Sequence, residues 1–391
     1  EMCIRDSSKY NHLVTSFGLK ALAPVYELMN QLIESGNVSK QKFSADPRPL
    51  DPNVPSSFLQ DFVFKNFMYS KQDDYEKQLT QLGIMEKDAY TCTCYMDEVG
   101  NTPAMGEVLS WSESSAVVYA NSVLGARCNR NSGIIDLMGS VVGYVPRFGL
   151  LTDEGRKATW IVKIETTKKP EAQLLGSAIG MKVMADVPYI VGLDKWLGGE
   201  LDDAAKTYLK DFGAATASNG AVGLYHVENI TPEAVKYGKD LIAEDAKVYV
   251  VDDAELQRVY ESYPALWKKK DAKPKLCFMG CPHMSLQQLI DWTEKVSQSL
   301  KEAGRARVCI PTVFTAAPAV LKKFQETPYA ETLKATGVIT SYICPLMYMN
   351  NPLSEKMPVI TSSNKLRTYT SARYYTDAEI LEQITKGGAD R

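Results

Sequence analysis

Histidine is scarce in this sequence, with three residues in a chain of 391. The motifs HExxH and GxSxG are both absent, which argues against a zinc protease and against an α/β-hydrolase. The phosphate-binding pattern GxxxxGK[ST] is also missing, so a P-loop is not supported. His12 and His226 stand outside any motif and are interpreted as structural or exposed. His283 is therefore the histidine of interest.

Excess charge and long apolar runs are absent as well. The formal charge is −3 without a large basic block, which gives little support to nucleic-acid binding. No apolar run of about 18 residues occurs, so we predict no membrane span. Residues 1–7 (EMCIRDS) lack the apolar core of a secretory signal and resemble a translated sequencing adapter. We set them aside as a non-native leader, expect a chain truncated at its start, and expect a cytoplasmic protein.

The cysteines form no CxxC pair. With Cys3 set aside, seven remain, an odd and scattered set in a chain without an export signal. This argues against a disulfide framework and favours reduced thiols or metal ligands. For any single cysteine, a small buried hydrophobic residue is the default interpretation. The seven are Cys92, Cys94, Cys128, Cys277, Cys281, Cys309 and Cys344.

What the sequence does contain is the composition of a globular α/β protein. It is 45% hydrophobic and 23% charged, which is ordinary for a soluble protein, and its length suits two or three domains. We predict an N-terminal α/β region over residues 8–240 and a C-terminal doubly wound α/β domain over residues 241–391. In the N-terminal region, the pattern predicts helices over 19–34, 72–82, 115–124, 134–141, 173–184 and 201–212, and strands over 89–95, 158–165, 188–192 and 221–226.

From residue 247 onward, strands and helices alternate. This order predicts a parallel sheet with helices on both faces, where ligands sit beyond the carboxyl ends of the strands. The predicted strands are 247–251, 275–279, 307–311, 338–342 and 358–361, and the predicted helices include 285–303, with Ser285 as its N-cap, 318–326 and 377–385. The loops that follow these strands should carry the chemistry.

Two of these loops contain a cysteine. Cys281, in the segment GCPH, follows one strand, and Cys344 follows another. The run YTCTCY adds Cys92 and Cys94, two candidates for one ligand position. Three thiolates from separate loops can hold an iron–sulfur cluster with one iron open to substrate, whereas a three-cysteine zinc site is the competing interpretation.

Two polar segments could bind an anion. Residues 112–130, SESSAVVYANSVLGARCNR, combine an apolar run with Asn and Arg donors that suit a charged or hydroxylated small molecule. Residues 361–365, TSSNK, follow a predicted strand and place hydroxyl groups beside a lysine. A polar turn is the alternative interpretation of the second segment.

Taken in order along the chain, the segments YTCTCY, SESSAVVYANSVLGARCNR, GCPH and VITSSNK resemble the catalytic large component of the aconitase X family. That family includes phosphomevalonate dehydratase large subunits and cis-3-hydroxy-L-proline dehydratases. The resemblance covers nearly the whole chain after residue 8. It implies an aconitase-like multi-domain α/β fold with parallel sheets flanked by helices, and dehydration of a small hydroxy acid.

The resemblance also implies the roles of individual residues. Cys92, Cys281 and Cys344 are expected to hold an iron–sulfur cluster, and Ser363 and Lys365 are expected to be catalytic. The expected substrate-binding residues are Ser114, Ser115, Asn121, Arg127, Asn129 and His283. A small swivelling subunit is the expected partner and would supply a catalytic serine. The alternatives left open are a relative that binds a small acid without a cluster and a zinc-dependent enzyme.

Overall fold

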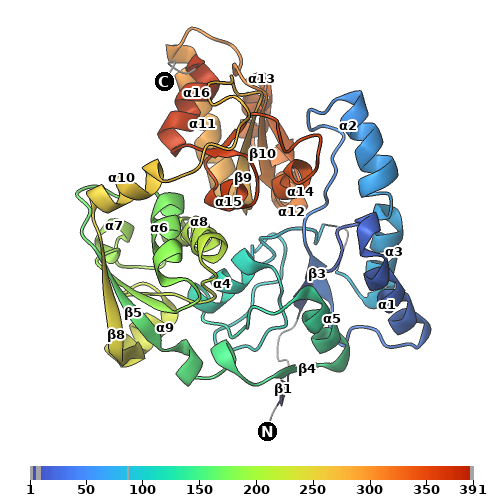
Figure 1. Cartoon of the computed structure of the whole chain (residues 1–391), viewed down its shortest axis with the longest axis vertical. Helices are drawn as coiled ribbons and strands as arrows, with labels where there is room; N and C mark the ends of the chain where they lie inside the picture. The colour runs from blue at the N-terminus through green and yellow to red at the C-terminus, as the bar shows by residue number, and fades with distance from the viewer. Residues whose placement is uncertain (1–2, 6–9, 86–87, 388–391) are drawn as a thin grey trace. The chain divides into compact units, whose positions relative to one another are not determined.

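The computed structural model describes residues 3–5, 10–85 and 88–387 of the chain (Figure 1). The chain folds into two compact units that are discontinuous in sequence. Unit 1 comprises residues 1–15, 38–44 and 100–263, and unit 2 comprises residues 16–37, 45–99 and 264–391. The sequence predicted two continuous domains, 8–240 and 241–391. Hydrophobic periodicity indicates where a strand lies in the chain but not which sheet it joins.

Part of the predicted leader is a strand. Cys3–Arg5 forms β1, which pairs antiparallel with β4 (Tyr144–Pro146). The other leader residues, 1–2 and 6–7, lie outside the described residues. Whether the leader is native stays a prediction.

Unit 1 is built on a four-stranded parallel sheet in the order β7-β6-β5-β8. Its strands are β5 Ala158–Ile164, β6 Pro188–Val191, β7 His226–Val227 and β8 Ile242–Val251, with β2 Asn11–Leu13 and β3 Phe43–Ala45 paired apart from them. Its α-helices are α4 Ser114–Ser122, α5 Gly133–Val142, α6 Ala172–Val183, α7 Asp194–Leu197, α8 Asp203–Asn219, α9 Pro232–Tyr237 and α10 Asp253–Glu261. Short 3-10 helices are η3 Gly149–Leu151, η4 Glu154–Arg156 and η5 Gly238–Leu241.

Helices α6 and α8 lie side by side in unit 1 (Figure 1) and are in contact. A Cβ added at Gly176 would lie 2.3 Å from the Phe212 carbonyl oxygen, and one at Gly180 would lie 2.7 Å from the Thr216 oxygen. The two backbones can approach this closely only because these positions are glycine. The small residues that follow Phe212 continue α8 to Asn219, well past the predicted end at 212.

Unit 2 is built on a five-stranded parallel sheet in the order β11-β10-β9-β12-β13. The strands are β9 Leu276–Met284, β10 Thr312–Ala316, β11 Ile339–Ser341, β12 Val359–Thr361 and β13 Arg373–Tyr374. The α-helices are α1 Ala23–Glu34, α2 Phe58–Val63, α3 Gln72–Leu82, α11 Leu286–Glu302, α12 Pro318–Gln325, α13 Pro328–Ala335, α14 Pro345–Met349, α15 Asn364–Tyr369 and α16 Asp377–Lys386. The 3-10 helix η1 is Lys20–Leu22, and the π-helix η2 is Phe64–Met68.

Each face of this sheet carries its own hydrophobic core. Successive side chains of a strand point to opposite faces. In β9, Cys277 and Met279 accordingly join a cluster with residues of α11, α12 and α16, while Leu276 and Phe278 join a second cluster with residues of η2, α14 and α15. The predicted α/β class, with parallel sheets flanked by helices, is confirmed.

Strand β9 makes an excursion at the segment GCPH. While β10 passes from Phe314 to Ala316, β9 passes from Met279 to Met284, so the intervening residues leave the regular ladder. The excursion starts at Gly280, with φ of +96°, where a Cβ would lie 2.3 Å from the Thr315 carbonyl oxygen. The sequence placed GCPH in a loop after the strand, but the segment interrupts a strand that then resumes.

The predicted strand 221–226 is a strand only at its last residue, since β7 comprises His226–Val227. Three further strand predictions are wrong, one in its sheet, one in its bounds and one altogether. Residues 247–251 belong to β8, which pairs with β5 in the sheet of unit 1, not with the C-terminal strands. The third strand of the C-terminal sheet begins after Pro311 instead of ending there, because proline lacks the N–H that a ladder needs. Residues 89–95 form no strand beyond an isolated bridge between Ala45 and Tyr90.

Candidate functional site

The segment that carries Cys92 is held by its own threonines. The hydroxyl groups of Thr91 and Thr93 lie 3.0 Å apart, and the Thr93 amide donates to the Thr91 oxygen at 3.1 Å. Both cysteines of the segment are buried, Cys92 with 9% of its surface exposed and Cys94 with none. The segment therefore has a defined conformation although it is not a strand.

Cys281 lies in the excursion of β9. Its carbonyl oxygen accepts a hydrogen bond from the Ser363 hydroxyl. Ser363 is at the same time the N-cap of α15, because its oxygen accepts from the Leu366 amide at 3.1 Å. The predicted catalytic serine thus ties the start of α15 to the backbone of a predicted ligand.

Cys344 stands at the N-cap of α14, and its amide donates to the Arg48 carbonyl at 2.9 Å. Arg48 is itself fixed by two hydrogen bonds to Glu76, at 2.7 and 3.0 Å, and by the Tyr90 ring, whose centroid lies 4.0 Å from its guanidinium. Burial, followed by the charges of Cys281 and Asp46, raises the pKa of the Cys344 thiol to about 12.

The three predicted ligands are connected within unit 2, and we call them the three-cysteine site. Cys281 and Cys344 belong to the same hydrophobic cluster, and the positive charge of Lys365 weakly opposes the rise that burial causes in the pKa of Cys344. The His283 amide donates to the Cys92 sulfur at 3.4 Å. Across the described residues, however, no group of three or more His, Cys, Asp or Glu is arranged to hold a metal ion.

The donor chemistry of the three-cysteine site fits an iron–sulfur cluster. Its donors are three thiols, and cysteine thiolates are the usual ligands of such clusters. The positive charge of Lys365 acts on Cys344, and the His283 amide offers an N–H···S bond to Cys92. Hydrogen bonds of this kind to sulfur and nearby charge are among the features that tune a cluster.

The substrate-binding residues predicted in segment 112–130 belong to unit 1, where its two asparagines are engaged with the backbone. Asn121 is fully buried; its amide nitrogen donates to the carbonyls of Cys128 and Gly223, both at 2.8 Å, and its oxygen accepts from the Cys128 amide at 2.9 Å. Asn129 donates to the Phe148 carbonyl and accepts from the Leu150 amide. The asparagines hold the loop's shape.

The other predicted residues of this segment differ in accessibility. Ser114 begins α4 and is half-buried, whereas Ser115 is buried and donates to Glu113 at 2.6 Å. Arg127 keeps 23% of its side chain exposed and pairs with Asp153, which is largely exposed. Of the two arginines in the segment, Arg127 is thus partly accessible and Arg130 is exposed.

Sequence reasoning missed a buried ion pair beneath this segment. Arg156 and Glu233 are 1% and 5% exposed, and they share three hydrogen bonds of 2.8 to 3.0 Å. Arg156 also donates to the side-chain and backbone oxygens of Asn121 at 3.0 and 3.1 Å. No local motif marks Arg156, since Glu233 lies 77 positions away.

Burial lowers the pKa of His226, which lies beside this pair, to about 4, although a hydrogen bond to the Arg156 carbonyl opposes the change. The expectation that His226 is structural or exposed agrees with its burial at 1% exposure.

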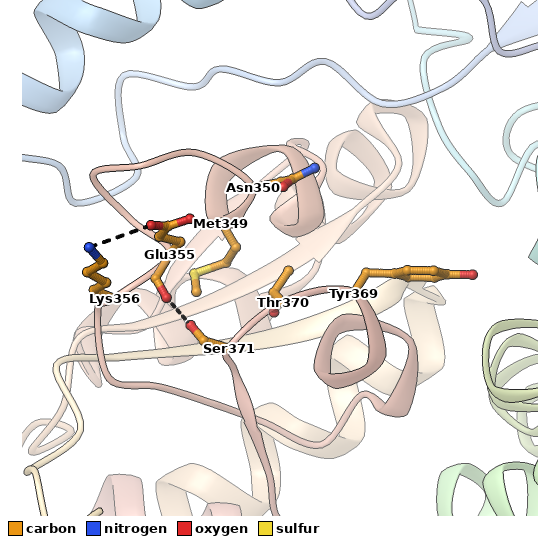
Figure 2. A pocket seen from close by; sticks show the side chains of 7 residues that line it. All are labelled: Met349, Asn350, Glu355, Lys356, Tyr369, Thr370 and Ser371. Atoms are coloured by element: carbon orange, nitrogen blue, oxygen red, sulfur yellow. Dashed lines mark hydrogen bonds and ion pairs between the residues drawn. The ribbon is translucent and has the colours of Figure 1, made fainter. Parts of the chain in front are cut away.

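A pocket of about 260 Å³ lies elsewhere in unit 2 (Figure 2). Its walls include Met349, at the end of α14, and Tyr369, at the end of α15. Cys344 and Ser363 cap the opposite ends of these two short helices. The pocket is therefore distinct from the three-cysteine site. In Figure 2, the Glu355 carboxylate forms an ion pair with Lys356, and the Glu355 backbone carbonyl accepts a hydrogen bond from the Ser371 hydroxyl. These polar groups of the pocket therefore interact with one another.

The fold and the thiols together define an α/β protein with two parallel sheets and a candidate thiolate site. Family models match the chain as the aconitase X first domain over residues 49–154 and the aconitase X second domain over residues 158–261. This chain belongs to the aconitase X family. Within the described residues, we find no helix of the length and apolar character that crossing a membrane requires.

Similar proteins come from archaea and a fungus. A phosphomevalonate dehydratase large subunit from Thermococcus kodakarensis is 35% identical over 71% of this chain and 70% of its own length. A cis-3-hydroxy-L-proline dehydratase from Hypocrea jecorina is 34% identical over 54% of this chain and 34% of its own. The crystal structure of Thermococcus kodakaraensis aconitase X in its holo form superposes with a TM-score of 0.77 and 26% identity, covering 98% of this chain and 90% of that one.

Proposed function

We propose that this chain is the large component of a dehydratase that acts on a small hydroxy acid and depends on an iron–sulfur cluster. The observation that carries the proposal is that Cys281 and Cys344 belong to one cluster of unit 2, while the His283 amide, two residues after Cys281, donates to the Cys92 sulfur. Family membership and the names of the relatives, phosphomevalonate dehydratase and cis-3-hydroxy-L-proline dehydratase, support it.

Cys92, Cys281 and Cys344 would hold the cluster. When bound, such a cluster supplies a Lewis acid, because three cysteine ligands leave one iron open to a substrate oxygen. Cys94 is the alternative donor in the same segment, and its complete burial argues for Cys92.

Dehydration breaks a C–O bond and a neighbouring C–H bond, forms a C=C bond and releases water. Lys365 would bind an anionic group of the substrate near the three-cysteine site. Ser363 would hold the Cys281 backbone and the start of α15 through the bonds it makes. In unit 1, Arg127 is the proposed contact for an anionic ligand, and Asn121 and Asn129 would hold its loop.

The proposed partner is a small subunit. The relatives are named large subunits, and the aconitase X resemblance implies a small swivelling component that carries a catalytic serine. Proton removal from the substrate is assigned to that component. The proposed substrate class is a hydroxy acid with one or more anionic groups, which suits the positive charge of Lys365.

The test is anaerobic reconstitution with iron and sulfide, followed by iron analysis and by assays with the small component on phosphomevalonate and cis-3-hydroxy-L-proline. Serine substitutions of Cys92, Cys281 and Cys344 should each lower bound iron and abolish dehydration. Cys277→Ala is the matched control, because Cys277 is fully buried in β9 but faces the other core. It should retain its iron.

The alternatives predict different results. A protein that binds no iron, with Cys281→Ser behaving like the parent, would overturn the proposal and favour a relative that binds a small acid without a cluster. Zinc after aerobic purification, with dehydration in the absence of iron, would favour the zinc enzyme. Retention of iron by Cys92→Ser together with loss by Cys94→Ser would transfer the ligand role to Cys94.

A further inference from the structure

His283 contacts every cysteine segment of the three-cysteine site. Its ring is 1% exposed; Nδ1 lies 2.9 Å from the Thr91 hydroxyl oxygen, and Nε2 lies 3.1 Å from the Ile343 carbonyl oxygen. Thr91 directly precedes Cys92, and Ile343 directly precedes Cys344. His283 itself follows Cys281 by two residues. One imidazole therefore joins three pieces of chain that are far apart in sequence.

The hydrogen-bonding pattern assigns a proton to one ring nitrogen. The Ile343 carbonyl can only accept, so Nε2 carries the hydrogen. In the neutral ring, Nδ1 then accepts from the Thr91 hydroxyl, which also accepts the Thr93 amide. Both ring nitrogens are thereby engaged within the protein. A substrate contact through this ring would require breaking one of these buried bonds.

The backbone of His283 makes a separate contact with the site. Its amide donates to the Cys92 sulfur at 3.4 Å. This contact fixes the Cys92 sulfur against the backbone of the segment that carries Cys281. The ring sets the spacing of the three segments, and the amide acts directly on one donor atom.

We propose that His283 is a positioning residue that holds the Cys92, Cys281 and Cys344 segments together before a metal enters, and that it does not bind substrate. This inference rests on the proposed function. Ordering three separate loops costs conformational entropy. Because the buried His283 ring orders them when the protein folds, metal binding does not have to supply that free energy. Loss of a residue that orients metal ligands typically lowers metal affinity by about 10- to 100-fold.

The variants separate the two ring contacts. His283→Leu removes both. His283→Asn retains a polar atom near the position of Nδ1, and His283→Gln retains one near Nε2, so each should restore part of the function. Thr91→Val removes only the hydroxyl that contacts Nδ1, with little change in side-chain size. It replaces His283→Leu as the test variant if His283→Leu does not fold. His226→Gln is the matched control, a histidine with the same 1% exposure that bonds to a backbone carbonyl in unit 1.

The experiment measures the iron and sulfide bound per chain after anaerobic reconstitution and the rate at which a chelator removes the iron. In a separate titration of the apoprotein with Co²⁺, the sulfur-to-cobalt charge-transfer absorption reports metal binding by the thiolates. We expect His283→Leu to release iron about 10- to 100-fold faster than the parent, with weaker Co²⁺ binding. Thr91→Val, His283→Asn and His283→Gln should lie in between. His226→Gln should match the parent among folded molecules.

The outcomes distinguish this inference from the proposed function. Iron retention and Co²⁺ absorption equal to the parent in both His283→Leu and Thr91→Val overturn the positioning role and leave the proposed function standing. A raised KM with unchanged kcat and iron retention in these variants assigns His283 to substrate binding instead. A parent protein that takes up neither iron nor Co²⁺ overturns both.

Discussion

Replacing Arg156 with methionine should destabilise unit 1 severely, because the guanidinium satisfies several buried acceptors at once. It holds both carboxylate oxygens of Glu233 and donates to Asn121 and to the Leu150 carbonyl at 3.0 Å. Its bond to the Asn121 backbone oxygen satisfies a carbonyl near the C-terminal end of α4. The change removes all of these donors and leaves a carboxylate that is 5% exposed.

The magnitude follows from burial. Removing one partner of a buried ion pair costs about 3–5 kcal/mol, and a buried carbonyl left without a donor costs about 1–3 kcal/mol. Asn121 keeps the Cys128 amide as a donor to its side-chain oxygen, so the carbonyls of Asn121 and Leu150 are the acceptors that lose a bond. We expect the free energy of unfolding to fall by at least about 4 kcal/mol, a large share of the about 5–15 kcal/mol typical of a protein.

The assay is urea unfolding at neutral pH, followed by fluorescence and circular dichroism. Arg258→Met is the matched control, since Arg258 pairs with Glu255 at 2.6 Å but is 66% exposed; its loss should have a much smaller effect, because water screens an exposed ion pair. Arg156→Met with Glu233→Leu should be more stable than Arg156→Met alone, because it leaves no uncompensated charge. A cost below about 1 kcal/mol for Arg156→Met, or a double variant less stable than that single one, would refute the reasoning.

Three further predictions concern stability. The pKa of His226 is lowered from 6.5 to about 4, because burial favours the neutral ring. The free energy of unfolding should therefore fall by about 3 kcal/mol as the pH is lowered from 6.5 to 4. In His226→Gln, urea unfolding curves recorded over this pH range should show a smaller fall. Gly280→Ala should lower the melting temperature and the iron bound after reconstitution, because its Cβ would meet the Thr315 carbonyl at 2.3 Å at a φ of +96°; an unchanged melting temperature would contradict this. Ser285→Ala should cost about 1 kcal/mol in chemical denaturation, since Ser285 caps α11 in a capping box, while Ser285→Thr should not.

Local signals in the sequence predicted the helices well. Ser285 caps α11 as expected, and α3 spans the predicted residues 72–82, with Gly83 in the left-handed conformation at its end. Caps and amphipathic periods are local properties, so a sequence window contains all the information they need. Sheet membership is not local. Nothing within β8 indicates that it pairs with β5 and not with the strands that follow it.

The same limit applies to the site. The sequence could propose Cys281 and Cys344 as ligands, because each follows a strand of one predicted sheet. It could not predict that GCPH interrupts β9, since that depends on the register with β10. The sequence also could not reveal the role of Arg156, because its partner Glu233 lies in α9, far from it along the chain.

The polar residues that made segments 112–130 and GCPH conspicuous in the sequence are for the most part engaged with the backbone. Asn121 and Asn129 bond to main-chain groups, as does one ring nitrogen of His283. A buried side chain that forms hydrogen bonds with main-chain groups holds a loop in one conformation. In segment 112–130 the accessible cations are Arg127, which is partly buried, and Arg130, which is exposed. Substitutions at the asparagines should accordingly act through the loop's shape and lower stability, whereas substitution of Arg127, the proposed substrate contact of this segment, should lower substrate affinity while leaving the unfolding curve nearly unchanged.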